Sequence, residues 1–227
     1  FLSFWLINTY FSLRIIKNLY LKKKIEINKL ILKSILTAFL ISIRIIGLLI
    51  LVQYIIAIII YLEKSQNSFL EFIKKNSSNL LIIIFSLSVF IYLFNPIFWH
   101  NPIEIVNSIK WMGKYPQNIC TLTNGTCFYS FNLPSSYIFI WLFYKLPILV
   151  LLGYCLFPLV ESKIFKDNVV TIYYGTITIT PPVIIVLFVL KDVALYDELR
   201  HLLFIFPLIF LTSLTNLYYL FNKKIFY

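Results

Sequence analysis

Long apolar segments, separated by short polar ones, limit what this chain can fold into more than any other feature. About 20 consecutive apolar residues suffice for a helix to cross the hydrocarbon core of a bilayer. Of the 227 residues, 60% are hydrophobic and 13% are charged, whereas soluble domains carry about 25% charged residues. We therefore expect an all-α, polytopic bundle of transmembrane helices, forming a single transmembrane domain over residues 1–227. The expected spans are residues 1–16, 35–62, 80–98, 137–160, 169–190 and 202–221.

The first apolar run, residues 1–16, does not have the features of a signal peptide. It begins with Phe1, no basic segment precedes it, and no small-residue cleavage site follows it. This apolar run instead resembles the C-terminal part of a membrane span whose beginning is missing. We therefore expect an N-terminally truncated chain, either the C-terminal part of a larger protein or an incomplete reading frame.

Lysines are concentrated in two polar segments. Segment 17–33 carries six lysines against one glutamate, and segment 63–78 carries three lysines against two glutamates. Because cytoplasmic segments are enriched in basic residues, both segments should lie on the cytoplasmic side. A single span between the two segments would place them on opposite sides of the membrane. We therefore predict a hairpin of two short helices within 35–62, broken near Arg44–Gly47. Such a break is tolerated where it is buried in protein or lines a cavity.

With this hairpin in place, segments 99–136 and 196–201 both fall on the extracytoplasmic side. The net charge of +11 does not indicate nucleic-acid binding, because the lysines stand beside apolar spans. Three cysteines and two distant histidines form no metal-ligand pattern. Motifs of soluble enzymes, such as the P-loop and G-x-S-x-G, are absent. We therefore expect membrane lipids as partners, and no metal, cofactor or nucleic acid.

The outer segment 99–136 begins with the features of an interfacial helix. Asn101 before Pro102 predicts a helix start with Asn101 as the N-cap. Apolar residues then recur at near-helical spacing beside a tryptophan, which is typical of an amphipathic helix lying in the membrane interface. This helix either anchors the loop or forms part of a groove for an acceptor or a lipid head group. The candidate residues of that groove are Trp99, Asn101, Lys110 and Trp111.

Two cysteines stand further along the same outer segment. On an oxidising face, Cys120 and Cys127 are a candidate disulfide pair, although their separation alone does not establish suitable geometry. Between them, Asn124-Gly125-Thr126 matches a glycosylation sequon. In so short a stretch, the Asn-Gly pair favours a tight turn over a glycosylation site.

Ionisable residues are densest directly before the last apolar run. They are Asp197, Glu198, Arg200 and His201. Charges this close to hydrocarbon are costly, so they indicate a partner or a function. Either Asp197 pairs with Arg200 and caps the helix, or the cluster binds a phosphate or orients a sugar, since a guanidinium matches phosphate with a rigid fork. Arg44 poses a similar choice between a function and pairing or snorkelling within the bundle.

The order of several short motifs resembles one family. The motifs are Trp99-His100-Asn101-Pro102, Lys110-Trp111-Met112 through Tyr115-Pro116, Leu133-Pro134-Ser135-Ser136-Tyr137, and Tyr196-Asp197 with Arg200-His201 and Pro207. In this order they resemble the C-terminal half of multispan glycosyltransferases that use polyprenyl-phosphate sugars, similar to protein O-mannosyltransferases and glycosyltransferase family 39. Segment 42–47 also resembles a short broken helix of that family. Residue 198 is Glu where a small residue, often Gly, is common in the family.

The resemblance implies a GT-C fold and transfer of a sugar from a polyprenyl-phosphate carrier to a glycan, lipid or protein acceptor. The implied location is a bacterial inner membrane, with the site facing the periplasm. The family's catalytic acidic residue lies in a first outer loop upstream of the matched part, so no catalytic residue is expected in this chain. The expected phosphate-binding or sugar-binding residues are Arg200, His201, Arg44 and Asp197. The alternatives are a transporter or flippase of a lipid-linked glycan, and a non-catalytic membrane subunit.

Overall fold

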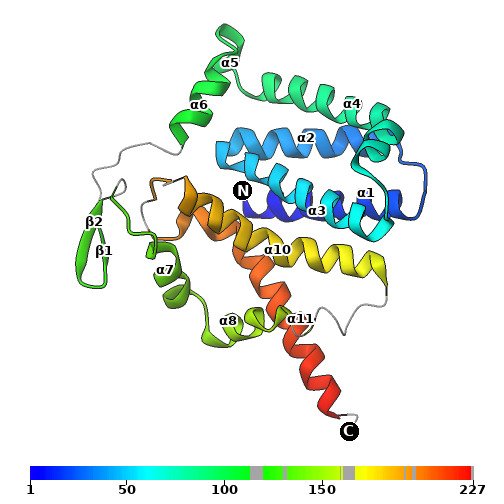
Figure 1. The fold of residues 1–227 in the computed structure, drawn as a ribbon. Coiled ribbons are helices and arrows are strands. Elements are labelled where there is room, and N and C mark those ends of the chain that lie inside the picture. Colours follow the sequence, from blue (N-terminus) through cyan, green and yellow to red (C-terminus); the bar gives the residue numbers. More distant parts are fainter. Residues whose placement is uncertain are drawn as a thin grey trace. The chain divides into compact units, whose positions relative to one another are not determined.

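The computed structural model describes residues 1–112, 120–129, 132–158, 160, 167–191, 193–195 and 198–225. The described residues are mainly helical, with one β-hairpin (Figure 1). They form two compact units, a first unit of Phe1–Met112 and a second unit of Gly113–Tyr227.

The first unit is built from helices that alternate in direction. Its elements are α1 (Leu2–Tyr20), α2 (Ile27–Ile43), the 3-10 helix η1 (Ile45–Leu49), α3 (Ile50–Ser65), α4 (Phe69–Phe94), α5 (Ile97–His100) and α6 (Glu104–Met112). At one end, the ring of Tyr61 in α3 lies 6.5 Å from Tyr20 and 5.7 Å from Phe72. At the other end, Phe39 of α2 lies 4.8 Å from Phe4 and 5.9 Å from Phe94. The ends of α1 and α3 therefore meet the starts of α2 and α4.

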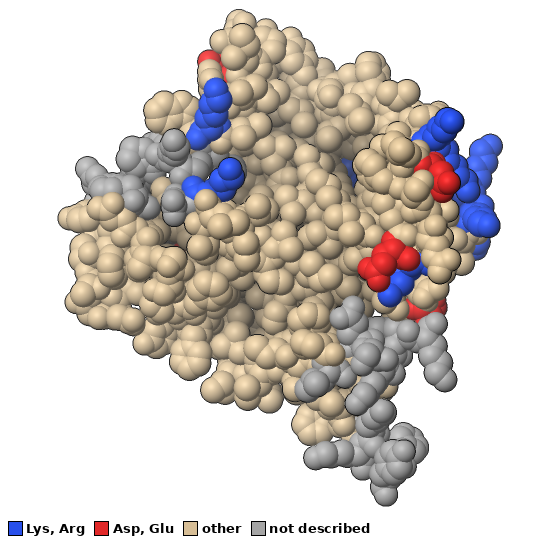
Figure 2. All heavy atoms as spheres, in the orientation of Figure 1, with Lys and Arg blue, Asp and Glu red and all other residues tan. Residues whose placement is uncertain are grey.

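Because of this alternation, the two lysine-rich segments lie at the same end of the first unit. The loop 21–26 joins α1 to α2 there, and residues 66–68 join α3 to α4. Figure 2 shows basic and acidic side chains crowded over this end, on the right in both views. The prediction that segments 17–33 and 63–78 share a side therefore agrees with the arrangement of the helices.

The predicted break near Arg44–Gly47 is present. Arg44 follows the last residue of α2 in an extended conformation (φ −153°, ψ 131°), and η1 begins directly after it. Gly47 is required here because a Cβ atom would lie 2.7 Å from the Leu40 carbonyl oxygen. The helices on both sides are longer than the predicted short ones. α2 begins at Ile27, within the lysine-rich segment, and the apolar helix Ile45–Ser65 is long enough to span a membrane by itself.

Four helices of the described part of the chain are long and apolar enough to cross a membrane. They are Ile45–Ser65, Phe69–Phe94, Asn168–Leu190 and Arg200–Phe221. The prediction of an all-α chain with membrane-spanning helices is thus confirmed at this level. The last two of these helices match the predicted spans 169–190 and 202–221 closely, whereas α4 begins well before the predicted residue 80.

The second unit departs from the prediction in its first helical segment. Its elements are β1 (Cys120–Thr123), β2 (Thr126–Tyr129), α7 (Tyr137–Lys145), α8 (Ile148–Cys155), α10 (Asn168–Leu190), η2 (Arg200–Ile205) and α11 (Phe206–Ile225). The expected span 137–160 is not one straight helix, since the chain bends by 117° between α7 and α8. Pro147 is the cause, because the residue before a proline is driven out of the helical region. Leu146 accordingly adopts φ −98° and ψ 137°.

Buried polar contacts join α8, α10 and α11. Pro182 has no N–H for the Thr178 carbonyl one turn earlier, and the Tyr154 hydroxyl donates to that carbonyl instead, at 2.5 Å. The Tyr174 hydroxyl donates to Asn216 Oδ1 at 2.6 Å, and Asn216 Nδ2 donates to the Gly153 carbonyl at 2.9 Å. These bonds hold α8, α10 and α11 together within the second unit.

Candidate functional site

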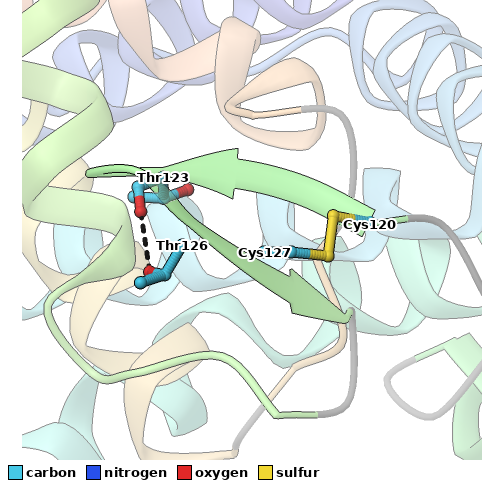
Figure 3. Close-up of a disulfide and its surroundings, with 4 residues drawn as sticks. All are labelled: Cys120, Thr123, Thr126 and Cys127. Atoms are coloured by element: carbon cyan, nitrogen blue, oxygen red, sulfur yellow. Dashed lines mark hydrogen bonds between the residues drawn. A yellow bond between two sulfur atoms is a disulfide. The ribbon is translucent and has the colours of Figure 1, made fainter.

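The two cysteines of the outer segment close a β-hairpin. β1 and β2 pair antiparallel, and a disulfide joins Cys120 to Cys127 (Figure 3). The connecting residues Asn124 and Gly125 have φ values of 51° and 78°, which is the conformation of a two-residue hairpin turn and the reason that Asn-Gly is favoured there. The predicted turn and the candidate disulfide are therefore both present in the structure.

The hairpin packs against α7. Trp141 Nε1 donates a hydrogen bond to Thr123 Oγ1 at 3.1 Å, and the Thr126 hydroxyl donates to the Thr123 carbonyl at 2.9 Å (Figure 3). Between hairpin and helix runs an open groove of about 380 Å³, which we call the hairpin groove. Its lining residues are Leu122, Thr123, Asn124, Trp141, Tyr144 and Lys145.

A second groove adjoins the first at Lys145. It has a volume of about 270 Å³, and we call it the arginine groove. Its lining residues are Lys145, Glu198, Leu199, Arg200, Leu203 and Phe206. Lys145 Nζ forms an ion pair with Glu198 and lies 5.5 Å from the centre of the Trp141 ring. The two grooves therefore share one cation, which a carboxylate from the start of the last span holds in place.

Glu198 adopts an unusual backbone conformation. Its φ of 61° lies in the left-handed region, where a residue with a Cβ is strained by about 1–2 kcal/mol and glycine is not. Strain of this kind persists only where the surroundings enforce it, and it is concentrated at functional sites.

The predicted phosphate-binding residues belong to both units of the chain. Arg200 is exposed, lines the arginine groove and begins η2. His201 is half-buried and is not among the residues that line this groove. Asp197 and its predicted pairing with Arg200 lie outside the described residues. Arg44 belongs to the first unit, where it is exposed at the end of α2 rather than enclosed within a helix bundle.

The predicted groove residues of the outer loop also belong to the first unit. Asn101 Oδ1 accepts from the Ile103 amide at 3.2 Å, so it acts as the predicted cap, although the regular part of α6 begins only at Glu104. Trp99 Nε1 donates to the Tyr92 carbonyl at 2.7 Å. Lys110 and Trp111 are exposed on α6, which contacts η1 beside Arg44.

Several apolar residues in and directly before α6 are exposed within its unit. Ile103, directly before the helix, and Val106 and Ile109 within it have exposed fractions of 66%, 49% and 43%. An amphipathic helix with an uncovered apolar face is what a membrane interface binds. The structure therefore fits the predicted interfacial helix and brings its residues to the Arg44 end of the unit.

Of the residues that line the two grooves, only Arg200 was predicted as a site residue. The α7 residues Trp141, Tyr144 and Lys145 lie in a run that we interpreted only as a span. The available signal was a lysine directly before Leu146-Pro147 in that apolar run. No protein-family model, curated protein or solved structure matches this chain. Within the described residues, no three His, Cys, Asp or Glu side chains gather in a way that would hold a metal ion. Function is therefore inferred from the chemistry of the two grooves.

Proposed function

We propose that this chain belongs to a membrane glycosyltransferase that binds a polyprenyl-phosphate sugar in the arginine groove. The sugar would pass to a glycan, lipid or protein acceptor on the extracytoplasmic face. The observation that carries the proposal is the composition of the groove. Two cations, Arg200 and Lys145, stand beside Leu203 and Phe206 at the start of a helix long enough to span a membrane. A phosphate joined to a long apolar chain needs a cation for the phosphate and an apolar surface for the chain, where a membrane helix begins.

The groove has the charges that such a reaction needs. When the glycosidic bond breaks, negative charge develops on the departing lipid phosphate, and a cation already in place stabilises that charge. The Arg200 guanidinium offers two parallel donors to phosphate oxygens. Lys145 forms an ion pair with Glu198, so a bound phosphate would compete with that carboxylate for the ammonium group. No residue of this chain is assigned as the catalytic base.

Two further features bear on the proposal. Residue 198 departs from the small residue common at this position in the family, although its left-handed conformation is one that glycine adopts without strain. The disulfide of the hairpin suits an oxidising compartment, and in a bacterium this means the periplasmic side of the inner membrane.

The test compares polyprenyl-phosphate binding by the protein in lipid nanodiscs with binding by its Arg200→Ala and Arg200→Lys variants. A charge-assisted hydrogen bond contributes about 1.5–3 kcal/mol, so Arg200→Ala should weaken binding by roughly 10- to 150-fold. The affinity of Arg200→Lys should fall between those of the wild type and Arg200→Ala, because lysine keeps the charge but lacks the two parallel donors of the guanidinium. Lys191→Ala, at an exposed lysine that ends α10, is the matched control.

In the full-length enzyme, Arg200→Ala should also lower sugar transfer far more than it lowers the melting temperature. Unchanged polyprenyl-phosphate affinity in Arg200→Ala, or normal transfer by that variant, would contradict the proposal.

A transporter or flippase of a lipid-linked glycan is the second candidate. The observation that favours it is the pair of interrupted helices, α2–η1 at Arg44 and α7–α8 at Pro147, since discontinuous helices are common at transporter binding sites. Reconstitution of the protein in proteoliposomes distinguishes a transporter from a glycosyltransferase. Movement of a polyprenyl-phosphate sugar across the bilayer without an acceptor indicates transport, and transfer to an added acceptor indicates the glycosyltransferase.

A further inference from the structure

The hairpin groove differs chemically from the arginine groove beside it. Two aromatic residues line it, Trp141 and Tyr144, together with the polar residues Thr123 and Asn124. Tyr144 is 66% exposed, so most of its ring surface is open to a ligand. Leu122 is the one aliphatic side chain among its lining residues. This lining is poorly suited to a lipid tail, which needs a continuous apolar surface.

Aromatic rings next to amide and hydroxyl groups suit a carbohydrate. A sugar ring presents a face of C–H groups, which packs on the π-face of Tyr or Trp, and a rim of hydroxyls, each both donor and acceptor. An asparagine amide meets such hydroxyls with a carbonyl and two N–H groups. The groove volume of about 380 Å³ lies within the range of small-molecule sites.

We infer that the hairpin groove is a carbohydrate subsite, in which a sugar packs on Tyr144 and Trp141 and bonds to Asn124. The inference rests on the proposed function of the arginine groove, because Lys145 lines both grooves and so places a bound sugar next to a bound phosphate. The sugar is that of the lipid-linked donor or of a glycan acceptor, and both share this chemistry.

The disulfide holds one wall of this subsite in place. A two-stranded hairpin is at best marginally stable alone, and here the Cys120–Cys127 bond and the Trp141–Thr123 hydrogen bond fix it. Asn124 lies at the tip of the hairpin, between these two constraints along the chain. Sugar binding should therefore depend on the oxidised hairpin, while phosphate binding in the arginine groove should not.

The experiment measures binding of methyl α-mannoside, methyl β-glucoside and N-acetylglucosamine to the protein in nanodiscs by saturation-transfer NMR. The variants are Tyr144→Ala, Asn124→Ala and the double variant Cys120→Ser/Cys127→Ser. Phe139→Ala is the matched control, since Phe139 is an exposed aromatic residue of α7 that does not line the hairpin groove. We expect at least one sugar to bind the wild type and Phe139→Ala, with affinity at least tenfold weaker in the three groove variants.

Measuring the polyprenyl-phosphate affinity of the same variants tests this inference separately from the proposed function. Asn124→Ala and the double cysteine variant should keep wild-type affinity for polyprenyl phosphate, which also shows that they are folded. Sugar affinity equal to wild type in Tyr144→Ala and Asn124→Ala, or binding of none of the three sugars by a wild type that binds polyprenyl phosphate, would overturn the subsite. Sugar binding lost in Tyr144→Ala, with phosphate affinity unchanged in Arg200→Ala, would keep the subsite and overturn the proposed function.

Discussion

Glu198 combines a strained backbone with an ion pair at the centre of the candidate site. Its φ of 61° is unfavourable for a residue with a Cβ, and its carboxylate neutralises Lys145. The side chains of the pair are 44% and 35% exposed, and ion pairs in contact with solvent contribute only about 0–1 kcal/mol to stability. The residue thus costs stability through its backbone and limits the positive charge of the groove.

Replacing Glu198 should therefore change binding more than folding. In Glu198→Gly the strain is removed, so we expect a melting temperature equal to or above that of the wild type. Without the carboxylate, Lys145 is free to meet a phosphate, and polyprenyl-phosphate affinity should rise. Glu198→Asn is the matched variant, because Asn tolerates the left-handed region and carries no charge. A clear fall in melting temperature in both variants would show that the ion pair outweighs the strain.

At the scale of elements, the break between α2 and η1 sets the architecture of the first unit. It turns the chain back, so that α3 ends beside the start of α4 and both lysine-rich loops reach one end. Asn95 Nδ2, at the end of α4, donates to Ser42 Oγ at 2.8 Å and ties a second helix to the same break. The close approach of Gly47 to the Leu40 carbonyl is the contact on which this turn depends.

Gly47→Ala tests that dependence. An added Cβ would lie 2.7 Å from a backbone oxygen, a contact that only a backbone shift relieves. Overpacking of this kind typically costs about 1–3 kcal/mol, so the melting temperature in detergent should fall. Ile43→Ala, at an exposed position on the last turn of α2, should have a smaller effect. Equal melting temperatures for the two variants would mean that the break does not need glycine.

At the scale of the whole molecule, the distribution of charge predicts how the chain lies in a membrane. The lysine-rich end of the first unit is opposite the end at which α6 contacts η1. Because basic residues are retained on the cytoplasmic side, the lysine-rich end should face the cytoplasm and α6 the outer interface.

Labelling of single cysteines checks this orientation. In a Cys155→Ala background, Lys23→Cys and Lys74→Cys lie in the two lysine-rich segments, and Lys110→Cys lies on α6; all three positions are exposed. In sealed, right-side-out vesicles, an impermeant maleimide should label Lys110→Cys directly. The other two should be labelled only after the membrane is made permeable. Labelling of Lys23→Cys and Lys74→Cys from opposite sides would contradict the arrangement of α1 to α4.

Part of this fold could be predicted from the sequence. The helices near 169–190 and 202–221 follow from the length of their apolar runs, because each helix satisfies its own backbone hydrogen bonds. The Asn124-Gly125 turn and the cap at Asn101 follow from the conformational preferences of single residues. The break at Arg44–Gly47 was predicted from the lysines of segments 17–33 and 63–78, which favour the same side of the membrane for both segments. The candidate site was predicted only in part, since Arg200 was named while its neighbours from α7 were not.

The sequence by itself therefore determined the membrane class, two of the spans and the hairpin turn, which depend on residues close together in the chain. It also determined the break, which follows from the distribution of lysines on both sides of the apolar run 35–62. Only the tertiary structure decided that Lys145 meets Glu198, more than fifty residues further on. It likewise decided that Lys33, assigned from its charge to a loop, is buried in α2 with its ammonium 3.9 Å from the centre of the Tyr54 ring. Contacts of this kind arise from the packing of distant segments, and no local pattern of charge or hydropathy encodes them.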